Sequence, residues 1–314
     1  MGDTREGDNL YSNSVIALDV HTGKLVGYHQ YHWNDSWDWD EVTTPLLIDF
    51  QRGAKTVHGL VHAGRDGYLW FLARDAKGIN FVDALPYVQQ NVFTSINPRT
   101  GRPAYDLTHK PGTQGAKDFC PSFWGGKDWP PVAYSPRTRL LYIPANENLC
   151  ARLAGEPVQY EAGQIYMGVQ PPGPGSESGL LPTPDAAHHI GEIQAWRVDG
   201  KPERVWTHEF KGPNWGPLLV TAGDLLFAGG TNDRAFRAFD ARSGEVLWEQ
   251  RTSSGVTGVP ITYEVDDVQY VAVFAGWGVD AERMQALLNE QLEQRVPVPQ
   301  GGVLWVFALA PQRE

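Results

Sequence analysis

The sequence has little of several features, and each scarcity excludes a class of protein. Basic residues are outnumbered, with 26 Lys and Arg against 37 Asp and Glu, and no Lys/Arg-rich run offsets the net charge of −11. Such a chain repels phosphates, so no nucleic acid is expected as a partner. No run of about 18 apolar residues occurs, so we expect no membrane span. The first residues also lack the apolar core of a signal peptide, so either the protein is cytoplasmic or its true N-terminus lies elsewhere.

Cysteine is scarce too, since only Cys120 and Cys150 occur. In a reducing compartment they would be two small buried hydrophobic residues. In an oxidising compartment they could close a 30-residue loop, for which the loop-entropy relation gives roughly 3–4 kcal/mol of stabilisation. Their spacing does not choose between these states, and two cysteines without a nearby Cys/His set do not form a zinc site.

Glycine, proline and tryptophan are abundant instead, with 34 Gly, 23 Pro and 12 Trp, as suits short strands joined by turns. One unit recurs: an alternating strand, then Asp-x-x-(Thr/Ser)-Gly, then a second strand that ends near a Trp. The Asp and the hydroxyl can cap the turn, Gly supplies the positive φ, and the Trp can lie over the next copy's turn. Phe236 follows Gln194 by 42 residues, the period of a four-stranded propeller blade. An all-β propeller is therefore expected, with a β-sandwich of similar hairpins as the alternative. The copies begin at Val15, Gly67, Ile193, Phe236 and Val303.

Two insertions interrupt the repeats. A Pro- and Gly-rich loop is expected near residues 151–190, and a helical insertion near residues 279–295. The helix is predicted over Ala281 to Arg295 because its apolar side chains fall at helical spacing. His58 and His62 would share one face of a strand, without the glutamate that a zinc protease helix needs, so they do not predict a zinc site. The apolar residues of the helix are Met284, Leu287, Leu288 and Leu292.

The most informative segment is Trp37-Asp38-Trp39-Asp40-Glu41, in which tryptophan and acid alternate. If the run is extended, Asp38 and Asp40 share a side-chain direction. Two carboxylates side by side repel unless a cation or a proton lies between them. Such a pair suits a metal ion and a general base working together. The alternative is turn chemistry, in which Asp side chains accept hydrogen bonds from nearby backbone, and the motif alone does not decide.

The Asp-x-x-Thr-Gly-x-x-x-Trp repeats, the Trp37-Asp38 pair and Cys120-Pro121-Ser122 together resemble the quinoprotein alcohol dehydrogenases, from about Gly7 to about Leu309. The resemblance implies an eight-bladed propeller of four-stranded blades. It also implies pyrroloquinoline quinone (PQQ) and a Ca²⁺ or lanthanide ion as cofactors, and oxidation of a primary alcohol or similar CH–OH substrate to the aldehyde. A periplasmic location and a cytochrome c electron acceptor follow from the same resemblance. The rival from another class is a non-catalytic propeller with this repeat, acting as a protein-binding scaffold.

The resemblance assigns roles to two aspartates and one arginine. Asp38 matches the family's catalytic aspartate and is a metal ligand by the same match. Asp40 matches the extra acidic ligand of lanthanide-using members, although sugar-oxidising branches can also carry Asp there. Arg65, in His62-Ala63-Gly64-Arg65-Asp66-Gly67, matches the basic residue that contacts the quinone oxygens.

Three further residues are implied to bind the cofactor, and two to form a disulfide. Asp128 and Trp129 match an Asn-Trp pair that borders PQQ, with Asp as a departure from the family's Asn. Trp215, in Asn214-Trp215-Gly216, matches a tryptophan near the PQQ ring. Cys120 and Cys150 match a family disulfide.

The start of the chain, Gly7-Asp8-Asn9-Leu10-Tyr11, matches the middle of the family sequence. We therefore expect residues 1–314 to form a partial propeller, the C-terminal half of such an enzyme with about half the blades. In full-length members the N-terminal half supplies a glutamate and an asparagine to the metal and a tryptophan that stacks on PQQ. The expectation is an incomplete metal shell and little PQQ-dependent turnover by this chain alone.

Overall fold

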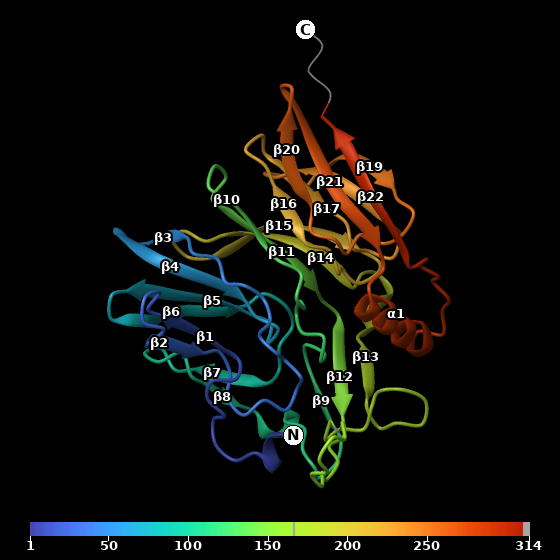
Figure 1. The fold of residues 1–314 in the computed structure, drawn as a ribbon. Helices are drawn as coiled ribbons and strands as arrows, with labels where there is room; N and C mark the ends of the chain where they lie inside the picture. Colours follow the sequence, from blue (N-terminus) through green and yellow to red (C-terminus); the bar gives the residue numbers. More distant parts are fainter. Residues whose placement is uncertain (166, 310–314) are drawn as a thin grey trace. The chain divides into compact units, whose positions relative to one another are not determined.

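The computed structural model describes residues 1–165 and 167–309, and most of their regular structure is β-strand (Figure 1). The chain forms two compact units. The first comprises Met1–Trp129 and Glu147–Ala186, and the second comprises Pro130–Asn146 and the residues from Ala187 onward. Each unit therefore joins segments that are distant in the sequence.

The first unit contains one full four-stranded antiparallel sheet and three smaller antiparallel sheets. The four-stranded sheet follows chain order: β3 (Asp49–Arg52), β4 (Lys55–Ala63), β5 (Tyr68–Asp75) and β6 (Gly78–Pro86). The smaller sheets are β1 (Ser14–Leu18) with β2 (Leu25–Gln30), β7 (Phe93–Ile96) with β8 (Pro103–Tyr105), and β12 (Leu149–Leu153) between β9 (Lys117–Phe119) and β13 (Gly179–Pro182). Short 3-10 turns are η1 (Gly2–Thr4), η2 (Leu107–His109) and η3 (Pro184–Ala187).

The second unit contains three antiparallel sheets and helix α1 (Val279–Gln291). Its first sheet is β10 (Ala133–Ser135), β11 (Leu140–Asn146), β14 (Gly191–Arg197) and β15 (Glu203–Phe210). Its second sheet is β16 (Leu218–Val220), β17 (Leu225–Ala228), β18 (Ala235–Asp240) and β19 (Val246–Arg251). Its third sheet is β20 (Ile261–Val265), β21 (Val268–Gly276) and β22 (Gly301–Ala308).

These three sheets pack through two apolar cores, in the manner of consecutive propeller blades. Side chains of a strand alternate between faces, so β17 supplies both cores: Leu226 faces the first sheet and Phe227 faces the third. Full burial of one such side chain stabilises the fold by about 1.5–3 kcal/mol. The all-β class with four-stranded antiparallel blades is confirmed. The first core also contains Tyr142, Ile193, Phe210 and Phe239, and the second Phe236, Val271 and Val273.

The Asp-x-x-(Thr/Ser)-Gly turns form as the sequence predicts. Asp19 Oδ1 accepts hydrogen bonds from the backbone N–H groups two and three residues later, at 3.1 and 2.8 Å. Asp240 Oδ1 does the same at 2.7 and 2.9 Å. Gly23 and Gly244 close these turns at φ +66° and +75°, angles that favour glycine. The residue order Asp, hydroxyl, Gly therefore encodes a hairpin with a defined conformation.

A further copy of this turn was missed because it begins with Asn instead of Asp. Asn97 Oδ1 accepts from the backbone N–H groups of Arg99 and Thr100 at 3.0 and 3.1 Å. Gly101 follows at φ +74°. An Asn side chain carries the same acceptor oxygen as Asp, so the turn that joins β7 to β8 uses the same chemistry.

The predicted docking of Trp on the next copy's turn is present in the second unit. Trp206 of β15 lies against Gly244, where an added Cβ would fall 2.6 Å from the indole ring. The indole Nε1 also donates to Ala241 O at 3.2 Å. A glycine is thus required here twice, for its φ and for the close approach of Trp206.

The one α-helix of the described residues is shorter at its C-terminal end than predicted. It ends at Gln291 instead of Arg295. Glu293 adopts φ +49°, a left-handed conformation that stops the helix. Asn289 Oδ1 then accepts from Val296 N at 3.2 Å and holds the chain that leaves the helix. Met284 and Leu288 are buried as expected for the apolar face.

The expected loop near residues 151–190 is flanked by strands that pair with each other. Strand β12 continues to Leu153, and β13 returns at Gly179 to pair with it. Between them, the described residues from 154 to 178 form neither a helix nor a strand, apart from one bridge between Gly155 and Val169. Long loops without regular structure between paired strands suit surface insertions.

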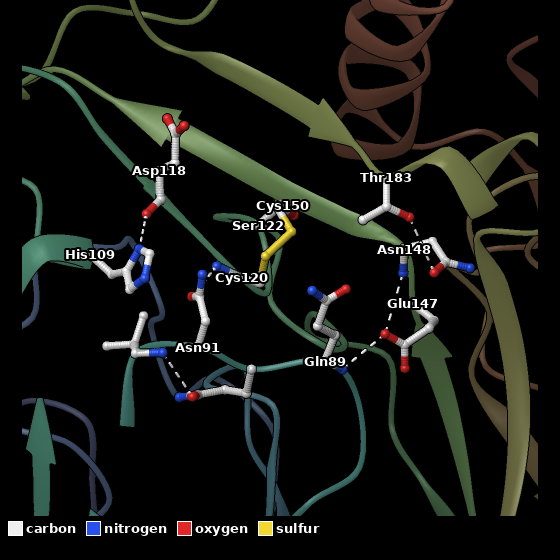
Figure 2. The surroundings of a disulfide bond; sticks show 12 residues. Gln89, Asn91, His109, Asp118, Cys120, Ser122, Glu147, Asn148, Cys150 and Thr183 are labelled. Carbon is white, nitrogen blue, oxygen red and sulfur yellow. Dashed lines mark hydrogen bonds between the residues drawn. A yellow bond between two sulfur atoms is a disulfide. The ribbon is translucent and has the colours of Figure 1, made fainter. Parts of the chain in front are cut away.

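The two cysteines form a disulfide, as the resemblance implies (Figure 2). Cys120 follows β9, and Cys150 lies in β12, which pairs with β9. Asn91 holds the first cysteine from the other side, because its Oδ1 accepts from Cys120 N at 2.8 Å. Ser122 N donates to Leu149 O at 2.8 Å. The bond therefore ties the segment that precedes Ser122 to the strand that carries Cys150.

Replacement of both Cys120 and Cys150 by Ser is expected to lower the free energy of unfolding by roughly 3–4 kcal/mol, because the unfolded chain regains the entropy of an open 30-residue loop. Urea titration followed by tryptophan fluorescence measures this change. Dithiothreitol should lower the stability of the unmodified protein similarly and leave the double variant unchanged. Two free thiols found by mass spectrometry in protein from an oxidising compartment would contradict the prediction.

Candidate active site

The Trp-Asp segment lies between β2 and β3 and is not a strand, which corrects the assumption of an extended run. Trp37 and Trp39 are fully buried and stack with ring centroids 5.1 Å apart, whereas Asp38 and Asp40 are exposed. The alternation of faces is therefore real. This alternation does not come from an extended strand, because Asp38 adopts φ +65° in the left-handed region. It comes from the burial of the two stacked tryptophans. Backbone strain of this kind in a non-glycine residue is typical of functional sites.

The tryptophans are anchored by their indole nitrogens. Trp37 Nε1 donates to His109 O at 2.8 Å, and Trp39 Nε1 donates to Ser122 O at 2.9 Å. The turn chemistry in this segment belongs to Asp35, whose Oδ1 accepts from Trp37 N at 3.1 Å. Within the described residues no side-chain hydrogen bond involves Asp38, so its carboxylate is not used for a turn.

Asp38 lies in an environment that favours its protonated form. Burial of the carboxyl group raises the pKa of Asp38 to about 6, although part of the residue is exposed. The Arg65 charge opposes this shift, while Asp40 and Asp128 add to it. These charges are close enough to influence one another. A carboxylate with a pKa near neutrality suits a general base.

Arg65 occupies the turn between β4 and β5. Its Nη2 donates to Phe123 O at 2.5 Å, and its Nη1 lies 3.5 Å from Asp128 Oδ1. Asp128, the departure from the family's Asn, therefore still borders Arg65, and its Oδ1 also accepts from Trp129 N at 2.7 Å. The Arg65 Nε is buried and has no hydrogen-bond partner. A buried donor without an acceptor is costly, so this atom suits an oxygen acceptor from a ligand.

Lys127 is a residue of this site that sequence reasoning missed. It is fully buried, and its Nζ donates to Thr43 Oγ1 at 2.5 Å and to Asp128 O at 2.6 Å. Burial lowers the pKa of Lys127 to about 7, against the opposing charges of Glu41 and Asp128. The sequence Gly-Gly-Lys-Asp-Trp gave no sign of burial, because a lysine beside an aspartate is usually solvated.

A second group of residues missed from sequence is a buried set of acids and histidines. His32 Nδ1 lies 3.8 Å from Glu41 Oε1 and 3.7 Å from Asp66 Oδ2, and its Nε2 lies 3.5 Å from Asp35 Oδ1. Burial disfavours the imidazolium, but the contacts with Asp35 and Asp66 outweigh it and raise the pKa of His32 to about 10. A protonated imidazole has no lone pair for a metal ion. The carboxylates around His32 therefore favour its imidazolium form.

Replacement of His32 by Gln should change how stability depends on pH. The pKa of His32 is higher in the folded protein than the usual 6.5, so its stabilisation is complete below about pH 6.5 and is lost as the pH rises toward 10. The difference in unfolding free energy between the native protein and the variant should shrink by up to about 1.4 kcal/mol per pH unit in this window. Denaturant titrations at pH 6, 7, 8 and 9 measure it. A difference that is constant with pH would refute the assignment.

Trp215 is the one predicted site residue that lies in the second unit. It is fully buried, its N donates to Gly230 O at 2.9 Å, and Asn214 Oδ1 accepts from Gly216 N at 3.0 Å. An added Cβ on Gly216 would fall 2.1 Å from Gly229 O, so two chain segments approach closely beside the indole. The remaining predicted site residues, Asp38, Asp40, Arg65, Asp128 and Trp129, all belong to the first unit.

The residues of the first unit fit the groups that the resemblance implies. Asp38 and Asp40 offer carboxylate oxygens, the ligand type that Ca²⁺ and other hard cations prefer. Arg65 offers a buried, unpaired N–H to an anionic oxygen. Among the described residues no helix is long and apolar enough to cross a membrane.

Comparison with known proteins gives consistent matches. The model of the family "Glucose/ethanol/alcohol dehydrogenase, beta-propeller domain" matches residues 1–82 and 187–271. Quinoprotein alcohol dehydrogenase PedH of Pseudomonas putida is 34% identical over 98% of this chain, which covers 50% of that protein. The 1-butanol dehydrogenase (cytochrome c) of Thauera butanivorans is 34% identical over 98% of this chain and 42% of its own length.

A solved structure agrees. A europium-containing methanol dehydrogenase superimposes with a TM-score of 0.86 at 32% identity, over 98% of this chain and 55% of that one. The chain thus spans about half the length of the curated relatives and of the structure that it matches. The similarity covers both units.

Proposed function

Because the chain belongs to the PQQ-dependent glucose/ethanol/alcohol dehydrogenase β-propeller family, we propose that it oxidises a primary alcohol, or a similar CH–OH substrate, to the aldehyde. The cofactors are PQQ and one Ca²⁺ or lanthanide ion. The observation that carries the proposal is the joint placement of Asp38 and Arg65: a carboxylate lies in the electrostatic reach of a guanidinium that has an unused buried donor.

The chain's own residues supply the acid–base and electrostatic parts of the reaction. PQQ, when bound, supplies the two-electron acceptor that takes a hydride from the carbinol carbon. Asp38 accepts the hydroxyl proton of the alcohol as the C–H bond breaks, so that a neutral aldehyde is released. Arg65 stabilises negative charge on an oxygen that its Nε and Nη groups reach. The proton then leaves Asp38 to solvent, because that side chain is partly exposed.

Asp38 and Asp40 would hold the metal ion, with Asp128, Trp129 and Trp215 bordering the cofactor. Two carboxylates in electrostatic contact gain most from a cation between them, which also opposes the burial and the lesser repulsion that raise the pKa of Asp38. Asp40 adds a negative charge that favours a trivalent ion over a divalent one. One relative named for europium and one named for cytochrome c support a lanthanide and a cytochrome c acceptor. The disulfide supports an oxidising compartment such as the periplasm.

Reduction of an artificial electron acceptor tests the proposal, with this chain reconstituted together with the N-terminal half of the enzyme, since the chain alone is expected to give little turnover. PQQ with CaCl₂ or LaCl₃ should give turnover with ethanol and 1-butanol, together with stoichiometric aldehyde. Protein without added PQQ is the control. If PQQ neither quenches the tryptophan fluorescence nor supports turnover, the scaffold function, in which the propeller binds other proteins, would replace this proposal.

A further inference from the structure

Glu41 contacts the backbone of the turn that carries Arg65. Its Oε2 accepts from Arg65 N at 3.2 Å and contacts His62 Nε2 at 2.6 Å. Its Oε1 accepts a longer hydrogen bond from Asp66 N at 3.4 Å. The Glu41 side chain is only 1% exposed. One carboxylate therefore receives two consecutive backbone N–H groups of the turn.

The carbonyl oxygen and the guanidinium group of Arg65 also form hydrogen bonds. Gly126 N donates to Arg65 O at 3.0 Å, and Phe123 O accepts from the guanidinium. An added Cβ on Gly125 would fall 2.5 Å from Arg65 O, at φ +77°. The Arg65 backbone is thus enclosed between the Glu41 carboxylate and the Gly125–Gly126 segment. A small rotation of the turn would displace the guanidinium at the end of its long side chain.

We propose that Glu41 is a positioning residue for Arg65, which sets the direction of the Arg65 guanidinium toward the quinone oxygens and Asp38. The inference rests on the proposed function, since it assigns the part that Glu41 plays in the same site. Glu41 touches neither the substrate nor the cofactor in this scheme, and it acts through the backbone of Arg65.

The anionic form of Glu41 is what the contacts require. The backbone N–H groups of Arg65 and Asp66 donate to its two oxygens, and His62 Nε2 lies 2.6 Å from one of them. Only a carboxylate presents acceptors on both oxygens, whereas a glutamine would turn an NH₂ group toward at least one of these donors. His62 is itself fixed, because its ring stacks on Tyr31 at a centroid distance of 4.3 Å. The arrangement therefore selects Glu and gives it a fixed orientation.

A double-mutant cycle on the enzyme purified from its own host tests the proposal. Glu41→Gln should raise the dissociation constant of PQQ, measured by quenching of tryptophan fluorescence, and lower kcat/KM, each by about tenfold. Arg65→Ala should change both by more. In the Arg65→Ala background, Glu41→Gln should have an effect of less than about threefold, because Glu41 acts through a side chain that is no longer there.

Controls separate positioning from loss of structure. Glu192→Gln removes another buried carboxylate with a histidine partner, His189 at 3.0 Å, and should leave PQQ binding unchanged. If Glu41→Gln does not fold, Glu41→Asp keeps the charge but shortens the reach, and the same non-additivity is expected. Additive losses in the cycle, with an active native enzyme, would overturn the positioning role alone. A native enzyme that neither binds PQQ nor oxidises alcohol would overturn the proposed function and this inference with it.

Discussion

Asp38→Asn is expected to lower kcat for alcohol oxidation by at least about 10³-fold while the affinity for PQQ changes by less than about threefold. Loss of a general base typically lowers the rate of the chemical step by about 10²–10⁴-fold. Loss of a metal-bound carboxylate lowers the rate further. The ring contacts assigned to Arg65, Trp129 and Trp215 do not depend on Asp38. Steady-state kinetics and fluorescence titration with PQQ, in parallel on the same preparations, measure the two quantities.

The variant is suited to the test because its fold should survive. Asn, like Asp, tolerates the left-handed conformation that residue 38 adopts at φ +65°. Asp267→Asn is a matched control, since Asp267 also has φ +60° and lies in the β20–β21 turn of the second unit. It should leave both kcat and PQQ affinity unchanged. An Asp38→Asn enzyme with more than about a tenth of native kcat would remove Asp38 from the role of base.

Local chemistry made the hairpin turns predictable from sequence. Asp19 and Asp240 accept from backbone N–H groups only two and three residues away. The whole interaction therefore lies within five consecutive residues. The Asn97 turn was missed only because the pattern was defined with Asp. The docking of Trp206 on Gly244 was also predictable, because the repeat places both at fixed positions in neighbouring blades.

Tertiary contacts explain what the sequence did not show. The left-handed φ of Asp38 follows from the stacking and anchoring of Trp37 and Trp39 against residues about 70 and 80 positions later. His62 was visible in the sequence, but its partner Glu41 lies 21 residues earlier, and nothing in either local pattern joins them. The burial of Lys127 likewise depends on Thr43. Networks of charged residues that pair across distant segments are therefore the part of this site that required a structure.

The family resemblance identified some of the site residues that local sequence patterns do not reveal. It named Asp38, Asp40, Arg65 and Asp128, and the structure places all four in the first unit, with Asp40, Arg65 and Asp128 within electrostatic reach of Asp38. It did not name Glu41, which stands beside Asp40 in the sequence and contacts the backbone of the Arg65 turn. Motif comparison finds groups that touch the ligands more readily than groups that hold them in place.

Asp40→Ala is expected to weaken the response to lanthanide by about tenfold and the response to calcium by less, about fivefold. The Coulomb energy between a ligand and an ion scales with the ion's charge, so loss of one carboxylate removes about 1.5 times as much attraction from a trivalent ion as from a divalent one. Lanthanides and Ca²⁺ both prefer oxygen ligands, so charge and not ligand type separates them here. Titration of metal-free, PQQ-loaded protein with LaCl₃ and with CaCl₂ gives both half-saturation concentrations.

Two companion variants make this result specific to the charge of Asp40. Asp40→Asn keeps an oxygen ligand without the charge, and it should behave like Asp40→Ala toward lanthanide if charge is what matters. Asp185→Ala removes an exposed carboxylate in η3 and should leave both titrations unchanged. A full lanthanide response from Asp40→Ala would show that Asp40 is not a ligand. The selectivity would then have to come from oxygen donors other than this carboxylate, since Asp38 alone presents the same single charge to either ion.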